Sequence, residues 1–446
     1  MIMRASIRIF VVLLFLCGST TVSAADLADP AASNAPIGQE EIELPSGQEG
    51  IGADIFGKKG GFIHPFLLFE ETYTDNLYNT NTNEKEDFIT TISPGLWLAL
   101  PANREKLLDI GTTNTSPGGL NLSRIKPDTT RRAQGYFLYA PEFVLYADES
   151  DHNTVNHKAE GLFQYNFNMG LSIDVVDQFN RRSEVNDNGI SERLDEYQDN
   201  LLNFIMAYDP SEKIRFRVDY SNYDLEYDDS VNDYRNRNDN SFSAYVFYRI
   251  KPKTSVFVEY EFADISFDTN SDSDSVENRY YTGLEWAITA KTKGRVKAGY
   301  IKKDFDKEGM DDQDGFSYEI QAQHNFTPKR ALQVNGFRRF NESTMITSAT
   351  YLSTGLSAAW LQRFAEKWSG TLNVSYTNEE YKGNITFNGV TGERDDDLFS
   401  IAPAVRYEFR DWMLFDLGYI FAQRDSNFAP FDYNNNTIFF RIDISL

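Results

Sequence analysis

From Phe62 onward the sequence consists of short runs in which apolar and polar residues alternate one by one. The run at 213–221 alternates apolar with charged residues in the order Ile214, Arg215, Phe216, Arg217, Val218, Asp219 and Tyr220. The runs at 317–325 and 401–410 follow the same pattern. A period of two is typical of a β-strand with one wet and one apolar face, because successive side chains point to opposite sides. Helical spacing fits none of these runs, so we predict an all-β chain.

The connections between the runs are of two kinds, which alternate along the chain. Short ones lie at 209–213, 251–254, 290–294, 327–330, 365–367 and 410–411. Long, polar and mostly acidic ones lie at 75–87, 181–200, 228–240, 268–279, 302–315 and 378–397. An up-and-down transmembrane barrel has this arrangement, with tight periplasmic turns at one rim and long extracellular loops at the other. A soluble β-sandwich gives no reason for it.

Counting the runs predicts an antiparallel barrel of about 18 strands, within a range of about 16 to 18, and an even number is usual for bacterial barrels. An even number places both ends of the barrel on the short-turn side. The final run at 437–446 alternates apolar and polar residues to the carboxyl end. It resembles the terminal strand that the barrel assembly machinery recognises, with Leu446 in place of the usual aromatic residue.

The first residues have the features of a secretory signal peptide. Arg4 and Arg8 precede an apolar run at 9–16, and small residues follow up to Ala24. We predict cleavage after Ala24, because the run is shorter than the roughly 18 to 20 residues that span a bilayer. Cleavage would remove Cys17, the single cysteine of the chain, and with it any disulfide or thiol chemistry.

Between the signal and the barrel, residues 25–61 are rich in Ala, Pro, Ser, Gly and Glu. We predict a flexible periplasmic extension, with a plug or a docking tail as the alternative. The predicted domains are therefore a signal peptide at 1–24, this extension at 25–61 and a barrel at 62–446. The mean hydropathy of −0.48 does not argue against a barrel, because transmembrane strands need only about 9 to 11 residues.

The net charge of −24 disfavours nucleic acid as a partner, because affinity for nucleic acid rests on basic residues that contact phosphates.

All five tryptophans lie close to a predicted short turn, and none lies in a long loop. We expect them to form an aromatic girdle at the periplasmic membrane interface. They are Trp97, Trp286, Trp360, Trp368 and Trp412.

The segment from Phe66 to Leu98 resembles the opening of a family of outer-membrane β-barrel porins that are associated with exopolysaccharide production operons. The resemblance rests on a strand, an Asp-Asn-apolar step at 75–77, a polar loop, Asp87 with Phe88, and a Ser-Pro-Gly at 93–95. It covers about thirty residues, and beyond them only the strand pattern is similar. It implies a barrel and suggests polysaccharide secretion, and it supplies no catalytic residues. The polar insertion at 111–130 departs from a compact periplasmic turn.

The charged face of the strands is the candidate functional surface. A mid-plane Arg or Lys that faces lipid costs about 2 to 4 kcal/mol, so we expect these side chains to point into the lumen. Rings of charge inside a pore act as a selectivity filter. The alternative is that the charges pair across strands and hydrate the wall. The candidates are Lys213, Arg215, Arg217, Asp219, Glu259, Glu261, Glu285, Arg295, Lys297, Glu319, Arg406, Glu408, Arg410, Arg441 and Asp443.

We expect neither catalysis nor a cofactor. The four histidines are His64, His152, His157 and His324, and nothing in the sequence pairs one of them with a serine and an orienting acid. The acidic stretch at 310–321 matches part of a calcium loop but has Met310 and Gln321 where acidic ligands are required. We interpret the acidic loops as solvated charge and predict no metal site.

The sequence therefore predicts a channel in the outer membrane of a Gram-negative bacterium, with a charged aqueous lumen that passes a hydrophilic solute. An exopolysaccharide is the expected cargo. A non-conducting barrel that acts as a surface receptor, adhesin or assembly scaffold is the alternative. The expected partners are outer-membrane lipid, lipopolysaccharide, the barrel assembly machinery and periplasmic polysaccharide-export proteins.

Overall fold

The computed structural model describes residues 62–100, 132–185, 192–289, 291–308, 310–343, 345, 349–387, 390–410 and 412–445. The predicted signal peptide at 1–24, the extension at 25–61 and most of the connection between the second and third strands, at 101–131, lie outside these residues.

Eighteen strands form one antiparallel sheet. They are β1 (Ile63–Thr74), β2 (Asp87–Leu100), β3 (Ala133–Tyr146), β4 (Thr154–Asn166), β5 (Leu171–Val185), β6 (Leu194–Tyr208), β7 (Ile214–Tyr227), β8 (Arg237–Lys251), β9 (Thr254–Phe267), β10 (Ser275–Thr289), β11 (Thr292–Phe305), β12 (Gln313–Thr327), β13 (Arg330–Glu342), β14 (Thr350–Arg363), β15 (Trp368–Tyr381), β18 (Asp395–Arg410), β19 (Met413–Ser426) and β20 (Tyr433–Ser445).

A two-stranded hairpin of β16 (Ile385–Phe387) and β17 (Val390–Gly392) lies in the connection between β15 and β18. Short 3-10 helices η2 (Ser150–His152), η3 (Ser230–Arg235), η4 (Ser271–Ser273) and η5 (Ala429–Phe431) lie in other connections at the same end. Within the residues described, no helix has the length and apolar character needed to cross a bilayer.

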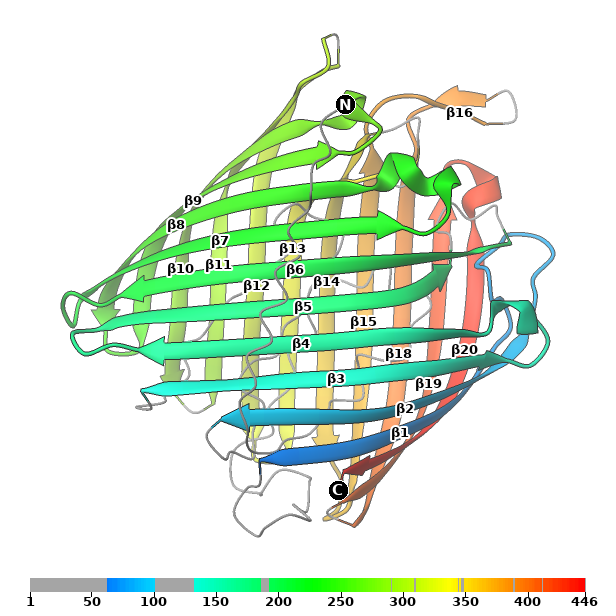
Figure 1. Cartoon of the computed structure of the whole chain (residues 1–446), viewed down its shortest axis with the longest axis horizontal. Helices are drawn as coiled ribbons and strands as arrows, with labels where there is room; N and C mark the ends of the chain where they lie inside the picture. The colour runs from blue at the N-terminus through cyan, green and yellow to red at the C-terminus, as the bar shows by residue number, and fades with distance from the viewer. Residues whose placement is uncertain are drawn as a thin grey trace, which may run out of the picture.

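The sheet closes on itself through β1 and β20, which pair in antiparallel register from Phe66↔Ser445 to Thr74↔Thr437. In Figure 1 the blue first strand lies directly beside the red last strand. Closure pairs the first strand with the last, so none of the eighteen strands is an edge strand. The prediction of a closed, up-and-down antiparallel barrel of about 18 strands is confirmed.

Apart from the long connection at 101–132 between β2 and β3, short and long connections lie at opposite ends of the barrel. The predicted short turns fall between β6 and β7, β8 and β9, and the corresponding later pairs. In transmembrane barrels of this class the short-turn end faces the periplasm. We call this the periplasmic end, and the end with the long connections the external end.

At the external end, strands continue through sequence that we expected to be loop. Residues 181–200 were predicted to be one polar loop, yet β5 and β6 pair up to Val185↔Leu194. The reason lies in the surroundings of each face: past the apolar band the outer face becomes polar, as at the exposed Asp224 and Glu226 of β7. The inner face there can be apolar, as at Tyr223 and Leu225, so the apolar-out and polar-in pattern ends although the strand continues.

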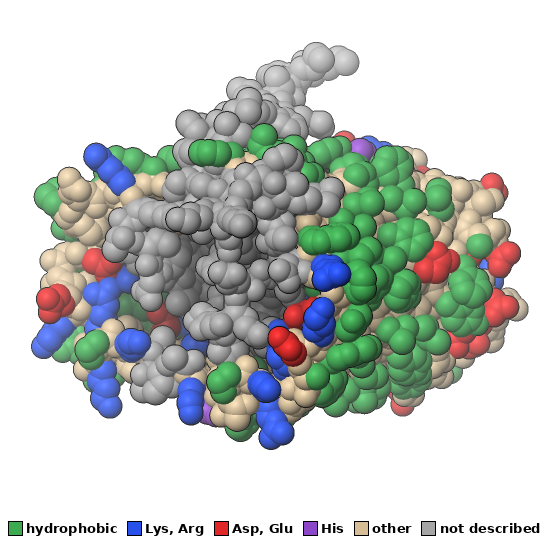
Figure 2. All heavy atoms as spheres, turned by 90° about the horizontal axis from the view of Figure 1, so that it is seen from below, with side chains coloured by type: hydrophobic (Ala, Val, Ile, Leu, Met, Phe, Trp, Pro, Cys, Tyr) green, Lys and Arg blue, Asp and Glu red, His purple; other side chains and the backbone are tan. Residues whose placement is uncertain are grey.

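Exposure alternates along the strands as the sequence pattern predicts. On β7, Phe216 and Tyr220 are exposed, whereas Arg217 and Asp219 between them are buried. The exposed apolar residues form the outer face of the barrel. Figure 2 shows a broad area of hydrophobic side chains on this face, with charged side chains gathered toward its margins. This area is the surface that contacts acyl chains in a membrane.

The Asp-Asn-apolar step of the first hairpin fastens the first strand to the last. Asp75 accepts hydrogen bonds from the backbone N–H and the side-chain amide of Asn436, both at 2.7 Å. The side-chain amide of Asn435 donates to the backbone carbonyl of Asn76 at 2.9 Å, and that of Asn76 donates to the carbonyl of Asn434 at 2.9 Å. The motif therefore fixes the closing seam at its external end.

The remaining residues of the same motif hold the first loop in place. The buried carboxylate of Asp87 accepts three backbone N–H groups, from Ala147, Asp148 and Glu149, each at 3.0 Å. A Cβ added at Gly95 would lie 1.9 Å from the ring of Phe66, so only glycine leaves room for that ring. Two parts of the motif thus have a structural reason: Asp87 anchors the backbone of a neighbouring connection, and Gly95 leaves room for the Phe66 ring.

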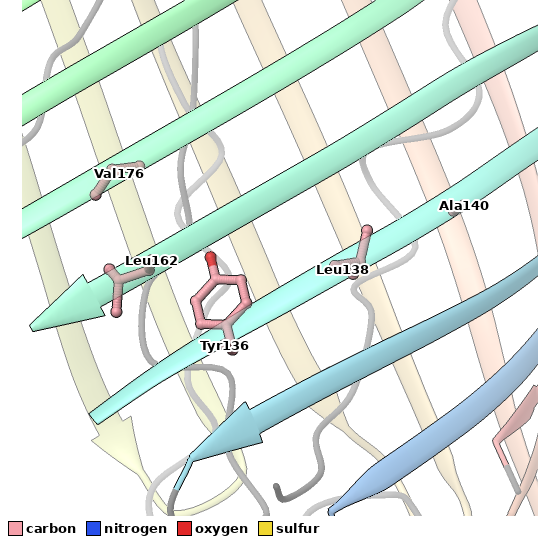
Figure 3. Close-up of a cluster of buried hydrophobic side chains, with 5 residues drawn as sticks. All are labelled: Tyr136, Leu138, Ala140, Leu162 and Val176. Atoms are coloured by element: carbon pink, nitrogen blue, oxygen red, sulfur yellow. The ribbon is translucent and has the colours of Figure 1, made fainter. Parts of the chain in front are cut away.

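Part of the inner face is apolar. Tyr136, Leu138 and Ala140 of β3 pack with Leu162 of β4 and Val176 of β5. Figure 3 shows these five side chains gathered on the three neighbouring strands. The sequence analysis treated the inner face as uniformly polar, so this cluster was not expected.

Replacement of Asp87 by Ala would leave the backbone N–H groups of Asp148 and Glu149 without their acceptor, whereas the N–H of Ala147 would keep the Phe88 carbonyl at 2.9 Å. We expect Asp87→Ala to lower the free energy of unfolding by about 1 to 3 kcal/mol. Urea unfolding from lipid vesicles, followed by tryptophan fluorescence, measures this change. The exposed loop variant Glu84→Ala is the control; an equal effect of both substitutions would contradict the anchoring role.

Two adjacent residues of β15 test which face meets lipid. Leu372 is exposed on the outer face, and Asn373 lies on the inner face opposite Ala359 and Ala402. We expect Leu372→Arg to lower the free energy of unfolding from vesicles by about 2 to 4 kcal/mol, because it places a charge in acyl chains. Asn373→Arg should cost much less, because its side chain enters the lumen. Equal costs would show that the outer face does not contact lipid.

Candidate functional site: the charged inner wall

A network of ion pairs lies on the inner face of β7 to β12, and Glu259 is at its centre. The carboxylate of Glu259 lies 2.8 Å from Lys297 Nζ and 3.2 Å from an Arg295 guanidinium nitrogen. Lys297 also pairs with Glu319 at 3.2 Å, and all four side chains are buried. Strand alternation brings them together, because these residues occupy inward positions on β9, β11 and β12, with β10 between β9 and β11.

Aromatic rings lie beneath the cations of this network. The Arg295 guanidinium lies 4.6 Å from the Phe257 ring centroid, and Lys297 Nζ lies 4.4 Å from that of Tyr281. Arg217, which pairs with Asp219 at 2.5 Å, lies 5.0 Å from the ring of Tyr245. The cations therefore lie over the aromatic rings of the inner face, and these side chains are buried together.

A second network continues toward the external end. Arg279 pairs with Glu261 at 2.8 Å and with Glu277 at 2.6 Å. Lys303 pairs with Glu277 at 3.2 Å and with Glu342 at 2.5 Å. Of these residues only Glu261 was predicted. Glu277, Arg279 and Lys303 lie in stretches that were predicted to be loops, and Glu342 was not among the predicted lumen residues. Continuing the period of two from Arg295 and Lys297 to the residue at 303 would have found that lysine.

Three further pairs lie on the opposite part of the wall, from β14 to β1. Arg406 pairs with Asp416 at 2.8 Å, Glu408 with Arg363 at 2.8 Å, and Arg441 with Glu70 at 2.5 Å. Each pair joins one residue of the predicted set to a partner outside it. Glu70 and Arg441 join the two strands of the closing seam, which sequence alone could not bring together.

The other predicted residues lie nearer the periplasmic rim. Arg215 pairs with Asp209 at 2.9 Å, and Glu285 lies opposite Arg295 in the β10–β11 register. Asp443 is half-buried on β20. Lys213 and Arg410 are exposed next to short turns. The lumen-lining role of the whole set remains a proposal.

The tryptophans lie toward the periplasmic ends of their strands. Trp368 and Trp412 are exposed, and Trp286 and Trp360 are half-buried. Trp286 lies on the outer face, where its ring occupies the space left by Gly294 of the next strand. Trp97 lies opposite His64 in the β1–β2 register, and its side chain is outside the described residues. A girdle at this interface remains a prediction.

A belt of tyrosines that the sequence analysis missed lies on the outer face toward the external end. Each tyrosine lies on the first strand of an external hairpin, and its hydroxyl reaches a polar side chain on the second strand. The partner is always the residue two positions before the tyrosine's register partner. The pairs are Tyr73 with Glu86, Tyr139 with His157, Tyr220 with Asn240, Tyr260 with Asn278, Tyr300 with Asp314, Tyr376 with Asp397 and Tyr419 with Asn436.

The ring of each tyrosine adds to the apolar band, and its hydroxyl binds a polar group above it. This is the behaviour of aromatic residues at a membrane interface. In the β5–β6 hairpin the equivalent diagonal pair is Asp177 with Asn200, at 3.1 Å. The tyrosine belt and the tryptophans thus lie at the two margins of the apolar band.

The comparisons with known proteins identify the family. The family model described as "Putative beta-barrel porin 2" matches residues 203–445, which is more than half of the chain. The chain belongs to this porin family. The matched residues contain the ion-pair networks and all strands from β7 onward. The protein is therefore an outer-membrane porin-type barrel channel, and its location is the bacterial outer membrane.

Solved structures that the porin matches include three outer-membrane proteins of Pseudomonas aeruginosa. Pseudomonas aeruginosa OpdK, solved with vanillate, is 8% identical with a TM-score of 0.45, and the match covers 86% of this chain and 100% of that chain. P. aeruginosa OpdO is 9% identical with a TM-score of 0.44 and coverages of 86% and 98%. The P. aeruginosa siderophore receptor PirA is 9% identical with a TM-score of 0.40 and coverages of 86% and 80%. No curated protein sequence matches the chain.

The two ends of the porin differ in charge. Among the described residues of the periplasmic turns and their flanks, the exposed bases outnumber the exposed acids, which are Glu212 and Glu366. These bases are Lys213, Lys251, Lys253, Lys291, Lys329, Arg330, Lys367 and Arg410. Acids dominate the external connections, where Asp228, Asp229, Asp268, Asp272, Asp306, Glu308, Asp311 and Asp312 are exposed.

The first loop of the porin is pinned over part of the external mouth. Leu77 and Tyr78 pack on Ile89 and Val144 of the inner face. Lys85 donates to Glu149 at 3.0 Å, which lowers the pKa of that carboxyl and raises the pKa of the lysine. Burial raises the pKa of the Tyr78 hydroxyl, so this group stays protonated as a hydrogen-bond donor.

The described residues of the porin hold no group of three or more His, Cys, Asp or Glu side chains arranged to bind a metal ion. His152 Nε2 lies 2.8 Å from the Tyr78 hydroxyl, and His157 Nδ1 lies 2.9 Å from that of Tyr139. Both histidines therefore take part in loop or interface contacts. The porin family and fold point to a channel rather than an enzyme.

Replacing Glu259 tests whether lumen water solvates the ion pairs of the inner wall. We expect Glu259→Ala to lower the free energy of unfolding by about 3 to 5 kcal/mol, because it leaves Arg295 and Lys297 without their shared carboxylate. Urea unfolding in lipid vesicles measures the loss. The exposed loop variant Glu308→Ala should stay within about 0.5 kcal/mol of wild type. A Glu259→Ala cost no larger than that of Glu308→Ala would mean that lumen water solvates both cations fully.

Proposed function

We propose that the barrel passes a hydrophilic solute across the outer membrane through its charged lumen, and that the physiological cargo is an exopolysaccharide on its way out of the cell. The observation that carries the proposal is the inner wall itself. Ion pairs lie over the aromatic rings of β7 to β12, so the wall beside a passing polymer is built from guanidinium, ammonium and carboxylate groups rather than apolar ones. Such groups can exchange hydrogen bonds with hydroxyls as water does.

The charge difference between the two ends supports entry from the periplasm by a polymer that carries acidic groups. Such a polymer would meet the bases of the periplasmic rim first and the acids of the external connections last. Attraction at the entrance raises the local concentration of the chain, and repulsion at the exit favours its release. Periplasmic polysaccharide-export proteins are the proposed partners that deliver the chain, and no covalent step occurs in the barrel.

A non-conducting barrel that binds partners through its external loops is the second candidate. The observation that favours it is the covered mouth, where the first loop packs on Ile89 and Val144 of the inner face. Such a barrel would serve as a surface receptor, adhesin or scaffold.

Planar-bilayer recording separates the two candidates. We expect the purified barrel to insert as discrete conductance steps, because a charged aqueous lumen carries ions. A heat-denatured sample is the control for detergent artefacts. A folded barrel that inserts without any ion current would contradict the channel and favour the scaffold.

Deletion of the gene tests whether an exopolysaccharide is the solute that the barrel passes. We expect less polymer in the culture medium and its accumulation in the periplasm, because the outer-membrane step is missing. Complementation with the wild-type gene is the control. If conductance is found while polymer secretion is unchanged, the barrel is a channel for another hydrophilic solute.

A further inference from the structure

One hairpin of the barrel departs from the cylindrical wall at its external end. The pairing of β12 with β13 stops at Tyr318↔Arg338. Above this point β12 still pairs with β11 up to Gln313, and β13 still pairs with β14 up to Glu342. The wall therefore divides between β12 and β13, and the two halves keep their own hydrogen bonds. We call residues 339–342 and 350–353 the tucked end.

The tucked end is buried on both faces. Phe340, Asn341 and Glu342 of β13 are buried in succession, as are the residues at 350–353 of β14. Lower on the same hairpin the usual alternation holds, with Leu356 exposed on the outer face. A strand end at the barrel surface would leave alternate residues exposed, so this end has left the outer surface.

Its contacts show that it has moved to the lumen side. Phe340 and Leu352 pack on Ile301 of β11, and Glu342 pairs with Lys303 of β11 at 2.5 Å. Ile301 and Lys303 are inner-face residues, because Tyr300 and Lys302 beside them are exposed. Because β12 lies between β11 and β13 in the sheet, the tucked end reaches Ile301 and Lys303 by passing behind β12 on the lumen side.

Beyond the tucked end, the connection reaches further around the mouth. Met345 packs against a cluster of Ile385, Phe428 and Phe431, and an Arg394 guanidinium nitrogen lies 3.3 Å from its sulfur. Contacts with β11 on one side and with the β15–β18 connection and η5 on the other therefore hold this hairpin inside the rim.

The hydrogen bonds on the outer face of the external hairpins support this placement of the tucked end. Seven of the other external hairpins carry the tyrosine pair, and β5–β6 carries the Asp177–Asn200 pair. In the β13–β14 hairpin, Arg338 instead donates to its direct register partner Thr354 at 2.7 Å. The diagonal hydrogen bond of the other external hairpins is thus replaced by a direct one in the hairpin that leaves the wall.

We propose that the tucked end is the constriction of the channel and sets the largest solute that it passes, with Lys303–Glu342 and the Phe340–Leu352–Ile301 contact holding it in place. This inference rests on the proposed channel function and names the element that limits it. An extended polymer can thread past a narrow constriction, whereas a compact solute of the same mass is excluded.

Permeation of graded neutral oligosaccharides into proteoliposomes tests the role. We expect Glu342→Gln and the double variant Phe340→Ala/Leu352→Ala to raise single-channel conductance and to shift the size cut-off upward. Leu356→Ala, on the lipid face of the same hairpin, and Glu84→Gln, which removes an exposed loop carboxylate outside the charged wall, are the matched controls and should keep the wild-type cut-off. An unchanged cut-off in both hairpin variants, with barrels that remain folded by heat-modifiable gel migration, would overturn the proposal.

A cysteine pair tests the position of the hairpin without relying on transport. Cys17 is the single cysteine of the sequence, so Ile301→Cys/Leu352→Cys in a Cys17→Ala background contains one thiol pair. We expect oxidation to cross-link the pair, to fix the wild-type cut-off, and to be reversed by reductant. Failure to cross-link in a folded barrel would overturn the tucked position. A barrel that cross-links but carries no current in any variant would refute the channel function while leaving the hairpin placement intact.

Discussion

Backbone hydrogen bonding in a medium without water governs this structure. Acyl chains offer no partner to an N–H or C=O group, so a sheet that crosses the membrane must have no edge. The chain satisfies this condition where β1 meets β20, which are joined over nine register pairs and by the Glu70–Arg441 ion pair. The side-chain bonds between Asp75 and Asn436 then hold the external end of the same seam. The inner wall, the mouth and the tucked hairpin all depend on this closure.

The closed cylinder separates two environments, and this separation made much of the fold predictable. Each strand faces lipid on one side and the lumen on the other. The alternation at Phe216, Arg217 and Val218 therefore indicates both a strand and the side to which each residue points. The strand number and the alternation of turn lengths could be read in the same way. The external strand ends could not, because the outer face there is polar while the inner face can be apolar, as at Tyr223 and Leu225, so the apolar-out pattern ends before the strand does.

The ion-pair partners of the charged residues could not be predicted from the sequence either. Glu259, Arg295 and Lys297 could be assigned to the inner face, but their convergence depends on the register of three strands. Glu70 and Arg441 stand at opposite ends of the sequence and meet only because the barrel closes. The position of the tucked hairpin could not be predicted from its own sequence, because it is set by contacts with Ile301 and Lys303 two strands away.

The margins of the apolar band fix the thickness of the bilayer that the barrel fits. On β15, Trp368 and Tyr376 stand eight residues apart on the outer face, which is about 27 Å along a strand at roughly 3.4 Å per residue. A strand tilt of about 35 to 45° reduces this to about 20 Å along the membrane normal. That span is shorter than the roughly 30 Å hydrocarbon core of a typical bilayer and suits the thinner outer membrane. In a thicker bilayer, acyl chains would cover the Asn and Asp partners of the tyrosines, so hydrophobic mismatch would oppose stable residence there.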